Sequence, residues 1–113
     1  DVAEEVDEET FFDTDKSGGT RVSSIHEKKK EIIPERYPPA QWNIFGAHAS
    51  DGDNAYDDNK YCRDLLRELL PGMQAYLYTH INERGTNFGG LWDAYEVVAR
   101  EFTDQFLMGR ITD

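Results

Sequence analysis

The stretch WNIFGAHASDGDN, residues 42–54, decides how the rest of this sequence is interpreted. It starts as an apolar run from Trp42 to Ala49, typical of an interior strand, and continues directly into the polar motif Ser50-Asp51-Gly52-Asp53-Asn54. Small residues near the end of the run leave space for a loop and its ligands beside the backbone. In a parallel α/β sheet, such a motif lies where strands end and helices begin, which is where these folds bind ligands.

A second polar motif, Ser17-Gly18-Gly19-Thr20, precedes a helical pattern that starts at Val22. Each motif alone is also typical of an ordinary turn, with Thr20 or Ser17 as a helix cap and Asp51-Gly52 as a turn. Together they occupy two strand-to-helix junctions of neighbouring units. A hydroxyl and a carboxylate brought together there are hard oxygen ligands, suited to Mg²⁺, Mn²⁺ or Ca²⁺.

The order of the remaining elements indicates the class of fold. Helical patterns alternate with apolar strand patterns, which implies parallel strands joined by right-handed crossovers. The expected elements are a helix that starts at Val22 and is ended by Pro34 and the Pro38-Pro39 pair, a strand over 42–49, a helix over 61–70, a strand over 73–81, a helix over 91–102 and a strand over 105–111.

Residues 1–16 are strongly acidic and form, at best, a short edge strand and a loop before a domain over 17–113. Within them, Asp13-Thr14-Asp15-Lys16-Ser17-Gly18 matches the first half of an EF-hand calcium loop. The second half does not match, because Ser24 stands where a bidentate Glu is required. A calcium-binding EF-hand is therefore kept only as an alternative.

Composition narrows the class of protein. The 113 residues carry a formal net charge of −11, which repels phosphate backbones and argues against nucleic acid. The single cysteine, Cys62, excludes a disulfide within a monomer and suits a reducing compartment. No apolar run is long enough to span a membrane, so we expect a soluble, cytoplasmic domain. The chain begins at Asp1 without a Met, and we expect it to be a piece of a longer protein.

The histidines and the cysteine give no catalytic pattern. His26 falls on a polar helix face and is expected to be solvated. His48 and His80 each lie near a strand end, where a packing role is expected rather than a role at the site. Cys62 has no base next to it in sequence, which argues against a nucleophile.

Several strings of the sequence resemble the YeaH/YhbH family, and they cover nearly the whole chain. They are EVDEETFF (5–12), SGGTRVSS (17–24), ERYPPAQWNI (35–44), ASDGDN (49–54), LWDAYE (91–96) and MGRI (108–111). The resemblance implies a von Willebrand factor A-type domain: an α/β fold with a three-layer, mostly parallel, Rossmann-like sheet. Here it would be the C-terminal part of that domain, incomplete because its N-terminal strands are missing.

The resemblance also implies a metal-ion-dependent adhesion site. Its Gly-Gly-Thr threonine corresponds to Thr20 and its Ser-Asp-Gly aspartate to Asp51, with Ser50 and Asp53 as candidates for the surrounding shell. The Asp-x-Ser-x-Ser loop of that site has no counterpart in this chain. We therefore expect Mg²⁺ or another divalent cation in the full-length protein and no ordered metal in this piece unless the ion concentration is high.

For function, the resemblance implies a cytoplasmic protein-binding module of a stress or sporulation protein. Its partners would be a PrkA-type serine protein kinase or a SpoVR-like protein, and it would not be an enzyme. The alternative from another class is a metal-dependent hydrolase that uses His48 or Asp53 as its general base.

The absence of the strand that carries the Asp-x-Ser-x-Ser loop leads to a prediction about assembly. Without it, the strand from Trp42 to Ala49 would be an edge with no charge or proline to shield it. We therefore expect a homo-oligomer with this strand at the contact, formed by strand pairing or by exchange of residues 1–12.

Overall fold

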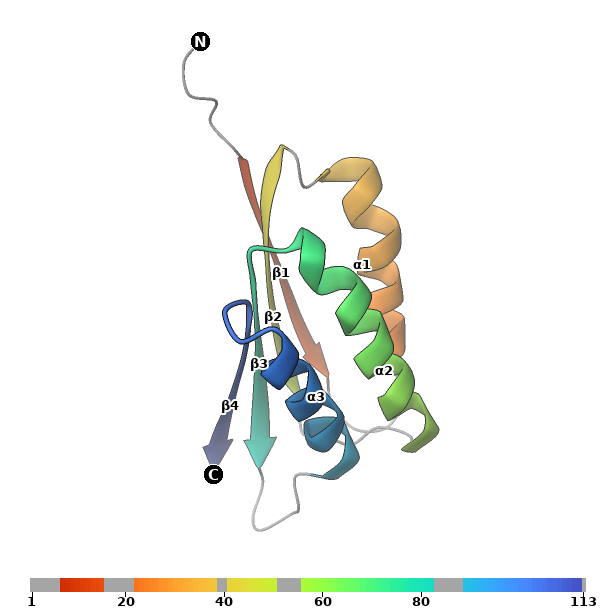
Figure 1. Cartoon of the computed structure of the whole chain (residues 1–113), viewed down its shortest axis with the longest axis vertical. Helices are drawn as coiled ribbons and strands as arrows, with labels where there is room; N and C mark the ends of the chain where they lie inside the picture. The colour runs from red at the N-terminus through yellow and green to blue at the C-terminus, as the bar shows by residue number, and fades with distance from the viewer. Residues whose placement is uncertain (1–6, 16–21, 39–40, 51–55, 83–88, 113) are drawn as a thin grey trace.

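The computed structural model of the chain describes residues 7–15, 22–38, 41–50, 56–82 and 89–112 (Figure 1). Strands and helices alternate along them. The elements are β1 (Asp7–Asp15), α1 (Ser23–Arg36), β2 (Trp42–Ser50), α2 (Tyr56–Leu69), the 3-10 turn η1 (Leu70–Gly72), β3 (Ala75–Asn82), α3 (Gly89–Glu101) and β4 (Phe106–Thr112). The expected alternation of helices and strands is confirmed.

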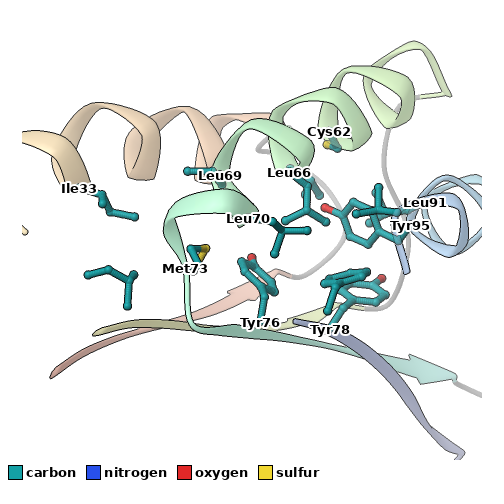
Figure 2. Close-up of a cluster of buried hydrophobic side chains, with 14 residues drawn as sticks. Ile33, Cys62, Leu66, Leu69, Leu70, Met73, Tyr76, Tyr78, Leu91 and Tyr95 are labelled. Atoms are coloured by element: carbon teal, nitrogen blue, oxygen red, sulfur yellow. The ribbon is translucent and has the colours of Figure 1, made fainter. Parts of the chain in front are cut away.

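The four strands form one parallel sheet in the order β1-β2-β3-β4. Because consecutive strands are neighbours and crossovers of this kind are right-handed, each connecting helix falls on the same face of the sheet. Figure 2 shows α1, α2 and α3 above one face. The chain is therefore α/β and Rossmann-like, but its described elements form two layers where three were expected.

The core lies between this helical layer and the sheet. Tyr76 and Tyr78 rise from β3 towards Leu66 on α2 and Leu70 on η1, and all four side chains are buried (Figure 2). The expected apolar stripe of α2 is confirmed, as is that of α3; the buried members are Leu65, Leu66, Leu69, Leu70, Leu91, Tyr95 and Val98.

Gly46 on β2 makes this packing possible. A Cβ added there would lie 2.7 Å from Cδ2 of Tyr76, far closer than van der Waals contact allows. The small residue in this strand thus accommodates a core ring, whereas the sequence suggested space for a loop and its ligands.

The opposite face of the sheet is not covered by any helix of the described residues. A row of side chains in register crosses it from β1 to β4: Phe12 pairs with Ala47, Ala47 with Leu77, and Leu77 with Leu107. Phe12 is 79% exposed, Leu77 43% and Leu107 59%. We call this row, together with the exposed Ile111, the open face.

The prediction that Trp42–Ala49 forms an edge strand is wrong. Residues Asp7–Asp15 form a nine-residue strand that pairs with β2 along its whole length, from Asp7 with Trp42 to Asp15 with Ser50. The acidic segment was expected to be, at best, a short edge strand and a loop, and its described residues form a full-length strand at the end of the sheet. By taking that place within the same chain, it satisfies the β2 backbone and removes the reason given for strand pairing between chains.

Helix α1 ends before Pro38, as expected, but Pro34 does not end it. Pro34 lies inside the helix, which continues to Arg36 and ends where the Tyr37 amide donates to the Ile33 carbonyl at 2.8 Å. Pro34 is exposed and only one turn from the end, so its ring interrupts little of the helix.

We predict that Gly46→Ala destabilises the chain by about 1–3 kcal/mol, because the new methyl group must displace the Tyr76 ring. Gly109→Ala on β4 is the matched control, since its Cβ would meet nothing within 4 Å. This control should leave the free energy of unfolding within about 1 kcal/mol of the parent value. Urea unfolding followed by circular dichroism measures both, and equal effects would contradict the packing of Gly46 against Tyr76.

Candidate ligand site at the carboxyl edge of the sheet

The carboxyl ends of the four strands meet in one register row. Asp15 on β1 pairs with Ser50 on β2, Ser50 pairs with His80 on β3, and His80 pairs with Arg110 on β4. Segments 16–21, 51–55 and 83–88, which follow β1, β2 and β3 in sequence, therefore start from neighbouring points on this edge. This is the edge at which parallel α/β sheets bind ligands.

The expected site residues divide between described and undescribed parts of the chain. Ser50 is the last residue of β2 and is fully buried. Thr20, Asp51 and Asp53 lie outside the described residues, in the segments that follow β1 and β2. What the structure brings together is thus the pair of strand ends that precede Thr20 and Asp51.

Below this row, the interface between α1 and the sheet contains an ion pair between a buried lysine and a partly buried aspartate. Lys29 of α1 is only 2% exposed and its Nζ donates to Asp13 Oδ2 on β1. The same ammonium lies 5.9 Å from the centroid of the Tyr76 ring, within cation–π range. Burial lowers the pKa of Lys29 and the Asp13 carboxylate opposes that shift.

His48 on β2 pairs with Asp13 on β1, and its side chain faces the same interior between the sheet and the helices. Among the described residues, neither of its ring nitrogens has a hydrogen-bond partner. Its ring packs at 5.4 Å from Tyr78 and at 6.3 Å from His26. Burial, reinforced by the charge of Lys29, lowers the pKa of His48 from 6.5 to about 4. His48 is therefore neutral at pH 7.

A second buried group joins α1 to α2. Asp58, in the first turn of α2, is 1% exposed and accepts from Ser23 of α1 twice. The Ser23 amide donates to Asp58 Oδ2 at 3.0 Å and the Ser23 hydroxyl to Oδ1 at 2.6 Å. Cys62 Sγ, one turn further along α2, donates to Oδ2 at 3.4 Å.

A third contact joins α1 to α3. His26 Nε2 and the Tyr95 hydroxyl lie 2.7 Å apart and both side chains are fully buried. Burial and the neighbouring Cys62 raise the pKa of Tyr95, whereas burial and Lys29 lower that of His26. The Ser23–Asp58–Cys62 group and the His26–Tyr95 pair thus connect all three helices.

The prediction that His26 is solvated is wrong, and the sequence contained a signal that would have corrected it. The buried residues of α1 include His26, Lys29 and Ile33, and Val22 precedes them. Their spacing of four, three and four residues is that of one helical face. The signal was obscured because two of the four residues are polar. His48 and His80 are buried, in agreement with the packing role expected for them.

The structure also bears on the EF-hand alternative and on Cys62. The EF-hand alternative requires a helix before the loop, but residues Asp7–Asp15 form a strand, and the carboxylate of Asp13 is bonded to Lys29. Cys62 is buried, and it donates a hydrogen bond to the carboxylate of Asp58. Within the described ranges, no three His, Cys, Asp or Glu side chains are grouped so that they could hold a metal ion.

A pocket of about 520 Å³ lies beside this edge, between the N-terminal halves of α2 and α3. Asp57, Lys60 and Arg63 line it from α2, and Gly90 and Asp93 from α3. Its acidic and basic groups balance, so it favours neither anions nor cations.

The described part of the chain contains no helix that is both long and apolar enough to cross a membrane.

Comparison with known proteins identifies relatives. The family described as "Protein of unknown function (DUF444)" matches residues 1–113. A UPF0229 protein of Pseudomonas paraeruginosa is 47% identical over 110 residues, covering 96% of this chain and 26% of the relative. A UPF0229 protein of Saccharophagus degradans is 48% identical over 110 residues, with the same coverage. One of Pseudomonas fluorescens is 48% identical over 105 residues, 92% of this chain and 24% of the relative.

The chain therefore spans about a quarter of the length of the curated relatives that it matches. The resemblance to the YeaH/YhbH family is confirmed, since that family is the same one. No solved structure matches the chain.

We predict that acid destabilises this chain in the window from pH 6.5 to about 4. In that window His48 takes up a proton in the unfolded state but not in the folded state, so the free energy of unfolding falls as pH falls. A pKa difference of this size contributes on the order of 3 kcal/mol. Urea unfolding at pH 7.5 and pH 5.0 measures the loss. His48→Leu, which cannot titrate, should reduce it, and an unchanged loss would show that His48 is not the group responsible.

Proposed function

We propose that this chain, which belongs to the DUF444 family, is the C-terminal part of a von Willebrand factor A-type domain that binds a protein partner through a divalent cation. Thr20 and Asp51 are the ligands from this chain, with Ser50 and Asp53 beside them. The observation that carries the proposal is the pairing of Asp15 with Ser50. It brings together, at the carboxyl edge, the starting points of the segments that contain Thr20 and Asp51.

The chemistry of the donors favours a shared cation over an enclosed one. Two protein oxygens leave most of a six-coordinate shell to water, which Mg²⁺ retains readily. A carboxylate supplied by a partner would then complete the shell and make binding dependent on the metal. Mg²⁺ or another divalent cation is therefore assigned to the full-length protein, and this chain alone should bind it only weakly.

The kind of partner follows from the resemblance. A PrkA-type serine protein kinase or a SpoVR-like protein is proposed, in a cytoplasmic stress or sporulation response. A binding module is favoured over a hydrolase because His48, one of the two candidate bases, is buried and has its pKa lowered to about 4. A general base needs access to water or substrate and a pKa near the working pH. The other candidate, Asp53, lies outside the described residues.

We predict that the full-length protein retains its partner in a pull-down with Mg²⁺ and loses it with EDTA. Asp51→Ala should reduce retention in Mg²⁺ to the EDTA level, because it removes the carboxylate ligand. Asp104→Ala is the matched control: it removes one negative charge from an exposed turn at the opposite edge of the sheet. Binding that resists EDTA, or that Asp104→Ala reduces as much as Asp51→Ala, would contradict the proposal.

A homo-oligomer of this chain remains proposed, but through a different surface from Trp42–Ala49. The open face offers a row of exposed apolar side chains, and parallel sheets are almost always covered on both faces. A second copy packed against it would bury Phe12, Leu77 and Leu107.

We predict that light scattering at micromolar concentration gives the mass of a dimer or higher oligomer, and that Leu77→Lys shifts it to a monomer by placing a charge on the open face. Thr103→Lys adds the same charge to an exposed turn at the amino edge and should leave the mass unchanged. A monomeric parent chain would exclude this assembly.

A further inference from the structure

Three buried polar side chains from three different elements meet between α1 and the sheet. They are His26 of α1, His48 of β2 and Tyr76 of β3, and we call them the histidine–tyrosine cluster. The centroid of the His26 ring lies 6.3 Å from that of His48 and 6.1 Å from that of Tyr76. Each side chain is at most 1% exposed, and the Tyr76 hydroxyl points from the sheet towards the helices (Figure 2).

Four polar atoms of this cluster have no hydrogen-bond partner among the described residues. They are Nδ1 of His26, both ring nitrogens of His48 and the hydroxyl oxygen of Tyr76. The remaining nitrogen of His26 is already engaged, 2.7 Å from the Tyr95 hydroxyl. Buried polar groups in folded proteins bond either to protein or to ordered water, because a bare group loses its hydration and gains nothing in exchange. The cluster therefore calls for a partner that the described side chains do not supply.

The chemistry of these atoms determines the kind of partner. A neutral imidazole presents one donor and one acceptor, and a hydroxyl presents both. A metal cation could not accept from the donors, and the ammonium of Lys29, 5.9 Å from the Tyr76 ring centroid, would repel it. The described ranges also contain no group of three side chains that could hold a metal ion. An anion would serve only the donors. Water both donates and accepts, so it alone of these serves every atom of the set.

The spacing of the rings also suits a water molecule. Two hydrogen bonds of about 2.8 Å that share one oxygen join atoms about 5 Å apart. Centroid separations of 6.1 and 6.3 Å leave room for atoms of neighbouring rings to lie at that distance. Buried waters of this kind typically make about three hydrogen bonds to polar groups that would otherwise be unsatisfied.

We propose that an ordered water molecule is bound inside the histidine–tyrosine cluster, where it bonds to His48 and to His26 Nδ1 or the Tyr76 hydroxyl. It links α1 to the sheet. Together with the ion pair between Lys29 and Asp13, it gives α1 a second polar attachment to the strands beneath it. The proposal is independent of the metal site, since all the residues that it uses lie in the interior.

Oxygen-17 magnetic relaxation dispersion at pH 7.5 counts the long-lived waters inside the chain and is not affected by protons that exchange with hydroxyl or ring groups. The double variant His48→Leu/Tyr76→Phe replaces the polar atoms of β2 and β3 by apolar ones. Tyr61→Phe is the control, because it removes a tyrosine hydroxyl that bonds to Glu27 on the surface. We expect the double variant to lose at least one long-lived water per chain and Tyr61→Phe to lose none.

A high-resolution crystal structure of the parent chain provides a second test that does not depend on how the variants fold. It should show a water oxygen within about 3.2 Å of a His48 ring nitrogen and of His26 Nδ1 or the Tyr76 hydroxyl. A structure in which these atoms bond directly to other protein groups would overturn the proposal. An equal count of long-lived waters in the parent chain and the folded double variant would overturn it as well.

Discussion

The parallel hydrogen bonding of β1 to β2 is the contact on which the other features of this structure depend. It extends over nine residue pairs, and its register places Asp13 beside His48 and Asp15 beside Ser50. Since β1 enters the sheet parallel to β2, α1 must cross over on the same face as α2 and α3. Lys29 can then reach Asp13, and Ser23 can reach Asp58. The same topology places every helix of the described residues on one face of the sheet and none on the other.

The side chains that the sheet presents to the helices change from aromatic to mostly polar along the strands. At the level of Gly46, the sheet presents Phe11, Tyr76 and Phe106 to the helices. Two residues further along each strand, the sheet presents Asp13, His48 and Tyr78 to the helices. Two residues beyond these, it presents Ser50 and His80 at the carboxyl edge. The Lys29–Asp13 ion pair adds little net stability compared with apolar packing, but removing Asp13 would leave the buried Lys29 ammonium without this partner, which is costly. Its value here is to determine which residue of α1 faces which residue of β1, close to the edge where ligands bind.

Some of this could be predicted from the sequence and some could not. The leucines of α2 and the spacing of Leu91, Tyr95 and Val98 in α3 are ordinary apolar periodicity, and they identified both helices. The apolar run from Trp42 that leads into Ser50 identified β2 and the position of its carboxyl end. In contrast, β1 was difficult to recognise because acidic side chains obscure its alternation. The buried face of α1 was missed because it contains His26 and Lys29, whose polar groups bond to Tyr95 and Asp13 from other elements. Asp58 could not be identified from sequence, since its donor lies 35 residues away in another helix.

The most direct test of this account is a set of cross-strand nuclear Overhauser effects in the labelled 113-residue chain. Parallel strands and antiparallel strands bring different backbone protons close together, so the pattern reports both the direction and the register of pairing. The account predicts parallel contacts between β1 and β2 that join Phe12 with Ala47 and Asp13 with His48. Antiparallel contacts, or a β2 strand with no neighbour on its β1 side, would contradict it, because the segments that contain Thr20 and Asp51 would then no longer start from the same point of the sheet.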